Sequence, residues 1–110
     1  MAGMKLNNLQ RRTLALLQQL ARHEDVAEID AETGDATILQ LPHPHGDHVH
    51  IGDVVVPSRF ASGLGNANVW QALARKGLVA NAYPYELVVT AKGMAFDTGI
   101  DTLMTADADH

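Results

Sequence analysis

The feature that most constrains the fold is an uninterrupted amphipathic stretch over residues 6–22. Leucines recur there with the 3.6-residue period of an α-helix, polar residues fall between them, and neither Gly nor Pro interrupts the pattern. The period-matching residues are Leu9, Leu16, Leu17 and Leu20. The spacing predicts a helix with one face against a core. A chain of 110 residues has the length of one domain, and its 46% hydrophobic content is enough to fold.

Two absences narrow the function. The chain has no cysteine, which excludes a disulfide scaffold, a thiolate zinc site and a cysteine nucleophile. No apolar run approaches the ~18 residues of a membrane span, and the first residues lead into the amphipathic stretch instead of a signal-peptide core. We therefore expect a cytoplasmic protein that works without a membrane and without a cofactor.

The middle of the chain predicts a β-hairpin over about 36–56. Two strand-like runs, 36–41 and 48–56, flank a segment with two prolines and a Gly-Asp pair, which suits a tight reversal. In the second run, Val49 and Ile51 are expected on one face, with His48 and His50 on the other. The preceding residues 24–35 are acidic and end in Thr33-Gly34-Asp35, which predicts a surface segment with a turn.

The second half predicts two short helices, a second hairpin and a last short helix. Ser58 is expected to cap a helix that the glycines at 63 and 65 close, and Gly77 to end a helix over 66–76. The strand-like runs 78–82 and 86–90 form the predicted second hairpin, Thr90 is the expected cap of a helix over 91–96, and residues 98–110 are expected to be a loosely held tail.

Residues 68–79 resemble the end of a winged-helix recognition helix and the start of its wing. Their Leu-x-x-Leu-x-x-x-Gly-Leu-Val pattern is filled by Trp70, Leu73, Gly77, Leu78 and Val79. Residues 85–93 are similar to the Leu-Thr-x-x-Gly phrase of bacterial winged-helix regulators. The resemblance covers 57–97. It implies an α+β fold, a winged helix-turn-helix domain over 1–97 with the hairpin inserted between its first and second helices. It also implies a DNA-binding transcriptional regulator, which is commonly a homodimer. We expect the dimer surface to be formed by the first helix and by the tail (Ile100, Leu103, Met104).

Such a regulator would read double-stranded DNA with the helix at 66–76. That helix is expected to bury Val69, Trp70 and Leu73 and to expose Asn68, Gln71 and Arg75, which lie at i, i+3 and i+7. Asn, Gln and Arg can each contact base edges with two hydrogen bonds. The candidate phosphate contacts are Arg59, Lys76 and Lys92. The alternative is that these polar residues only form an ordinary water-exposed helix face and contact no DNA.

The charge distribution leaves a second class of function open. The net charge is -5, and residues 24–56 hold eight acids with no Lys or Arg. A protein-interaction or adaptor module without DNA binding, whose acidic hairpin meets a basic partner, is therefore the second hypothesis.

The histidine-rich segment is the remaining motif. It matches the His-x-His-x-Asp-His motif of the metallo-β-lactamase superfamily, whose ligands hold zinc. We reject that family because its fold is about twice as long and needs further ligands downstream, whereas only His110 follows His50. A simpler metal site remains an alternative, with His43, His45, Asp47, His48 and His50 as candidate ligands. We expect no enzyme activity, since neither Ser58 nor Ser62 has a nucleophile-elbow context.

Overall fold

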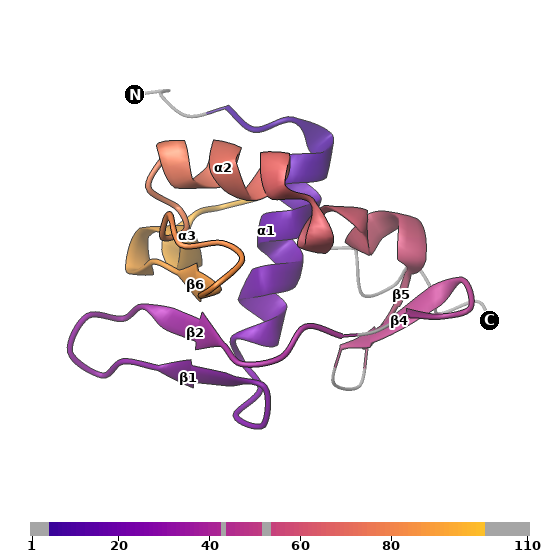
Figure 1. Cartoon of the computed structure of the whole chain (residues 1–110), viewed down its shortest axis with the longest axis horizontal. Coiled ribbons are helices and arrows are strands. Elements are labelled where there is room, and N and C mark those ends of the chain that lie inside the picture. Colours follow the sequence, from indigo (N-terminus) through magenta and orange to yellow (C-terminus); the bar gives the residue numbers. More distant parts are fainter. Residues whose placement is uncertain (1–4, 43, 52–53, 101–110) are drawn as a thin grey trace.

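The computed structural model describes residues 5–42, 44–51 and 54–100, without the side chains of Pro44, His45, Val54 and Phe60. Helix α1 (Asn8–Leu20) runs through the middle of the molecule, within the predicted 6–22 stretch (Figure 1). It begins with a capping box, in which the Asn7 side chain accepts the Gln10 N–H at 2.8 Å and the Gln10 side chain accepts the Asn7 N–H at 3.0 Å. Leu14, Leu16, Leu17 and Leu20 of α1 are buried inside this chain, and Leu9 is partly buried.

Within the described ranges, three further helices pack around α1: η1 (Ser58–Gly65), a 3₁₀ helix, α2 (Ala67–Arg75) and α3 (Ala91–Ala95). A Cβ at Gly63 would overlap the Thr13 hydroxyl, so glycine permits the close approach of η1 to α1. The expected Ser58 cap is wrong. Ser58 begins η1 without a side-chain cap bond, because its hydroxyl instead donates to the Gly46 carbonyl at 3.4 Å. The capping residue of α2 is Asn66, whose side chain accepts the Asn68 N–H.

The first sheet joins distant parts of the chain. Strands β1 (Ala27–Ile29), β2 (Ala36–Ile38) and β6 (Val88–Val89) are antiparallel in the order β1-β2-β6. Residues 24–35 therefore contain a strand that the acidic pattern hid. The predicted pairing of 36–41 with 48–56 is wrong, because β1 and β6 occupy both edges of β2. The second predicted hairpin is reduced to a bridge between Val79 and Val89, with a turn over 81–85. Two backbone hydrogen bonds join its arms, from the Ala80 N–H to the Val88 carbonyl and from the Thr90 N–H to the Leu78 carbonyl.

The second sheet lies at the other end of the molecule (Figure 1). It consists of β3 (Pro44–His45), β4 (His48–Ile51) and β5 (Val54–Pro57), antiparallel in the order β3-β4-β5. The alternation predicted for β4 is confirmed: Val49 and Ile51 are buried, His48 is half-buried and His50 is exposed. Residues 36–56 are thus divided between two sheets instead of forming one hairpin.

The C-terminal part of the described chain is capped and packed against the core as far as Ile100. Thr90 caps α3 by accepting the Gly93 N–H, and Gly77 ends α2 with a φ of 75°, both as predicted. Thr98 is buried and Ile100 packs against the core, so the folded body extends beyond the expected boundary at residue 97. Residues 101–110, with the predicted dimer contacts Leu103 and Met104, lie outside the described residues. The α+β class is confirmed, and no described helix has the length and apolar character needed to cross a membrane.

Candidate nucleic-acid interface

Helix α2 has the two faces that its sequence predicts. Val69, Trp70 and Leu73 are buried, whereas Asn68, Gln71 and Arg75 are exposed. The three exposed side chains follow the helical repeat and therefore lie along one line on the surface of the helix. Asn68, Gln71 and Arg75 are called the outer stripe below. They come from a helix of nine residues, which is about 13 Å long at 1.5 Å per residue.

The buried side of α2 is held by a hydrogen bond and by ring stacking. The Trp70 indole N–H donates to the Leu64 carbonyl of η1 at 2.8 Å. The same ring stacks on Tyr83, with centroids 5.1 Å apart and an interplanar angle of 21°. Trp70 thereby links α2 to the helix before it and to the loop after Val79. These two contacts, one with η1 and one with the loop, fix the rotation of α2 about its axis and so the direction in which the outer stripe faces.

A hollow of about 300 Å³ lies beside the outer stripe. It is lined by Gln71, Ala74 and Arg75 from α2 and by Asn81 from the loop over 81–85. The sequence reading of DNA contacts did not include Asn81, because a turn residue carries no helical spacing. The hollow combines amide and guanidinium donors with amide acceptors from two elements.

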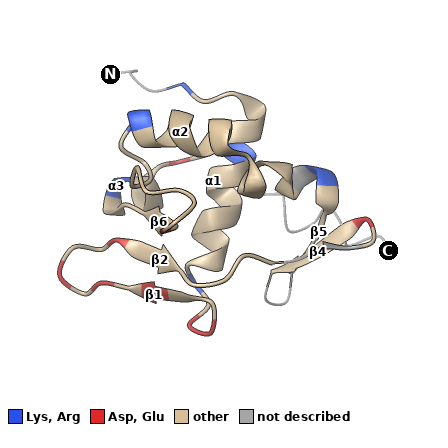
Figure 2. Ribbon diagram, in the orientation of Figure 1, with Lys and Arg blue, Asp and Glu red and all other residues tan. Residues whose placement is uncertain are grey.

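The basic residues divide into two groups. Arg75 lies in the last turn of α2, with Lys76 directly after it. The Lys92 ammonium lies 3.7 Å from the position that a Cβ on Gly77 would occupy, so Lys92 reaches the same helix end. Figure 2 shows this group at the end of α2 and on α3, whereas the basic segment of η1, which holds Arg59, lies at the opposite end of the molecule. The structure therefore brings Arg75, Lys76 and Lys92 together, without Arg59.

The acidic hairpin formed by β1 and β2 is well separated from α2. Figure 2 places its acidic segments on the opposite side of the molecule from α2. The hairpin contacts α3, the helix that holds Lys92, through Asp35, whose carboxylate accepts the Ala91 N–H at 2.8 Å. The outer stripe of α2 is left uncovered by the hairpin.

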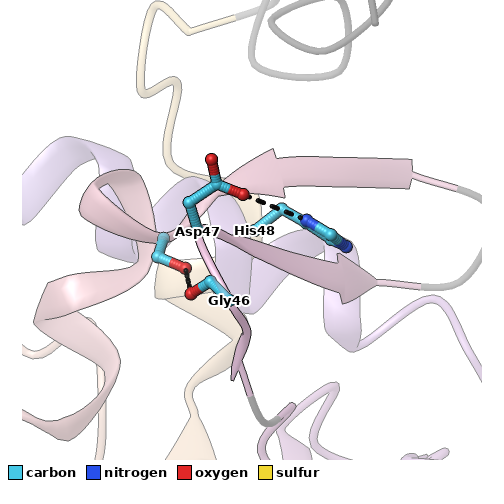
Figure 3. A network of polar contacts seen from close by, with 4 residues as sticks. Gly46, Asp47 and His48 are labelled. Carbon is cyan, nitrogen blue, oxygen red and sulfur yellow. Dashed lines mark hydrogen bonds and ion pairs between the residues drawn. The ribbon is translucent and has the colours of Figure 1, made fainter.

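The histidine segment forms only a loose cluster. The Asp47 carboxylate lies 3.4 Å from Nδ1 of His48, and both project near the turn that Ser58 contacts through Gly46 (Figure 3). The rings of His48 and His50 meet edge to face at 4.9 Å. Of the other candidate ligands, His43 and the side chain of His45 lie outside the described part. Among the described side chains, no three His, Asp or Glu residues are grouped closely enough to hold a metal ion.

Comparison with models of protein families, with curated proteins and with solved structures gave no match for this chain. Its function is therefore inferred from the geometry around α2 and from the sequence pattern that predicted it.

Proposed function

We propose that this protein is a winged-helix domain that binds double-stranded DNA through α2, in the manner of a bacterial transcriptional regulator. The observation that carries the proposal is the uncovered stripe of Asn68, Gln71 and Arg75, adjoined by Lys76 and Lys92 at one end. The chain order supports it as well. Strand β6 follows α2 and pairs both with β2, which precedes α2, and with Val79, which follows α2.

The chemistry of this stripe suits base edges and phosphates. The major groove is about 12 Å wide and admits an α-helix. Within it, the amides of Asn68 and Gln71 match adenine, and the guanidinium of Arg75 matches guanine. Lys76 and Lys92 fit phosphate contacts, which position a protein on the duplex without reading its sequence. Because the chain as a whole is acidic, binding depends on these few contacts and falls steeply with salt.

The assembly and location that accompany this proposal are a homodimer in the cytoplasm. Paired half-sites in DNA usually mirror a two-fold protein dimer. Leu14, Leu16, Leu17 and Leu20 of α1 are buried within the chain and are not part of the proposed dimer surface.

The second candidate is an adaptor that binds a basic partner, and strand β1 favours it. This strand lies at the edge of its sheet and exposes Glu28 and Ile29, the latter with 56% of its surface accessible. An acidic, partly apolar sheet edge can accept an added strand from a basic peptide.

The experiment is a fluorescence-anisotropy titration of labelled, fragmented genomic duplex DNA at two salt concentrations. Arg75→Ala should weaken binding by about 1–3 kcal/mol if the guanidinium makes two hydrogen bonds to a base. Lys92→Ala should weaken all sequences alike and reduce the salt slope by about 1. The matched control is Arg22→Ala, which removes an exposed arginine just beyond the C-terminal end of α1, beside the acidic segment.

The variants decide between the two candidates. Selective loss with Arg75→Ala and Lys92→Ala, with Arg22→Ala unchanged, supports DNA binding by α2. Absence of binding at low salt, or equal effects of all three substitutions, would overturn it and favour the adaptor.

A further inference from the structure

The first sheet has an open edge along β1. Strand β2 is central in this sheet, and the far edge of β6 is occupied by its bridge to Val79. Within the described ranges β1 pairs with β2 alone, and Figure 1 shows it at the margin of the molecule. An open edge presents backbone N–H and C=O groups on which another strand can pair.

The register of the β1–β2 ladder shows which backbone groups face that edge. The Val26 carbonyl accepts a hydrogen bond from the residue after β2 at 2.7 Å, and the Asp30 N–H donates to the residue before β2 at 2.9 Å. Bonding to one neighbour alternates along an antiparallel strand, so Glu28 between them also bonds to β2. Ala27 and Ile29 therefore direct their N–H and C=O groups toward the open edge.

The side chains beside this edge are acidic and apolar. Glu28 is exposed, whereas Ala27 points to the other face of the sheet and is buried. Ile29 lies at the end of the strand, with 56% of its surface accessible. Further exposed acids close to β1 in the chain are Glu24, Asp25, Asp30 and Glu32.

These charges select the kind of strand that can be added. If β1 of a second copy paired with this edge, with Ala27 opposite Ile29, the Glu28 residues of the two chains would lie directly opposite each other. Like charges at opposed positions destabilise a strand pair, whereas opposite charges stabilise it. Glu28 therefore protects the edge against a second copy but favours a strand that carries Lys or Arg.

We propose that the open edge of β1 binds an extended basic segment of a partner protein by antiparallel strand addition, and that this segment alternates basic and apolar residues. Opposed residues of paired strands share a face. A basic residue therefore lies opposite Glu28, and apolar residues lie opposite Ala27 and Ile29. The inference rests on the adaptor candidate and specifies its partner. It is independent of DNA binding, since β1 shares no residue with α2 or α3.

The test is a titration of the full chain with the peptide acetyl-Lys-Val-Lys-Val-Lys-amide, followed by backbone amide signals in two-dimensional NMR. In the proposed register, the central lysine lies opposite Glu28 and the two valines lie opposite Ala27 and Ile29. We expect a Kd on the order of 1 mM, with the largest shifts at the amides of Ala27 and Ile29. The peptide with Glu in place of each Lys should bind at least about tenfold more weakly.

N-methylated peptides separate strand pairing from charge attraction. Methylating both valine nitrogens removes the donors that face β1 and should weaken binding at least about tenfold. Methylating the nitrogens of the central and last lysines is the matched control. Those nitrogens face away from β1, so the Kd should change by less than about threefold.

Variants of the protein test the same contact from the other side. Ile29→Pro removes an N–H that faces the open edge and keeps the donors of the β1–β2 ladder. It should weaken binding at least about tenfold, whereas Ile29→Val should bind like the unchanged chain. Glu28→Lys should reverse the preference between the Lys and Glu peptides. Glu86→Lys makes the same charge change on an exposed residue before β6 and should keep the preference.

Strand addition is overturned if the two methylated peptides bind equally, or if Ile29→Pro binds like Ile29→Val. Binding by charge alone would then remain, and with it the adaptor candidate. Both are overturned if the Lys peptide shifts no amide of β1 up to about 10 mM. Should Ile29→Pro fail to fold, the methylated peptides, measured on the unchanged chain, still decide the matter.

Discussion

Replacing Trp70 with phenylalanine tests whether one side chain fixes α2 in its position. The substitution removes the buried hydrogen bond from the indole N–H to the Leu64 carbonyl and leaves that carbonyl without this donor, which costs about 1–3 kcal/mol. The smaller ring also leaves a void at a side chain that is 1% exposed, worth roughly 1 kcal/mol more. We therefore expect the free energy of unfolding to fall by roughly 2–4 kcal/mol, a drop of roughly 8–16 °C in melting temperature.

The assay for this variant is urea unfolding followed by far-ultraviolet circular dichroism, since Trp70 is the single tryptophan of the chain and its fluorescence is lost with it. Tyr85→Phe is the control, because Tyr85 is 91% exposed and should change stability by less than ~0.5 kcal/mol. A loss below about 1 kcal/mol with Trp70→Phe would refute the reasoning that the indole bond anchors α2 to η1.

Two further substitutions probe the packing of α3. Gly93→Ala should lower the free energy of unfolding, measured with urea, by at least about 2 kcal/mol, because the added Cβ would overlap the Leu78 carbonyl. Gly65→Ala is the control and should fold normally, because there is open space at its Cβ. Equal stability of the two variants would contradict this prediction. Asp35→Ala should lower the free energy of unfolding by about 1 kcal/mol and speed hydrogen exchange of the Ala91 amide. Asp35→Asn keeps an acceptor oxygen and should recover most of this stability. An unchanged exchange rate in Asp35→Ala would show that the hydrogen bond is not formed in solution.

The elements that the sequence predicts well are those with local causes. The leucine period of α1, the positive φ of Gly77 and the cap at Thr90 each depend on residues within one or two helical turns. The exposed stripe of α2 follows from the same periodicity. These features could be placed within about two residues because neighbouring side chains decide them.

Strand pairing escaped the sequence analysis because its causes are not local. Strand β1 has three residues and exposes Glu28 and Ile29, so it shows no alternation of apolar and polar positions over a usable length. The partner of β2 lies 53 positions further along, where Val89 pairs with Ala36.

The central position of β2 also sets the order of events during synthesis. Ala36 leaves the ribosome before Val89 has been made, and at 5–20 residues per second the delay is roughly 3–10 s. For that interval β2 can pair with β1 but has a free second edge, which is the kind of template on which nascent chains associate. We expect the acids of the β1–β2 hairpin to disfavour association of nascent chains during this interval, because like charges repel.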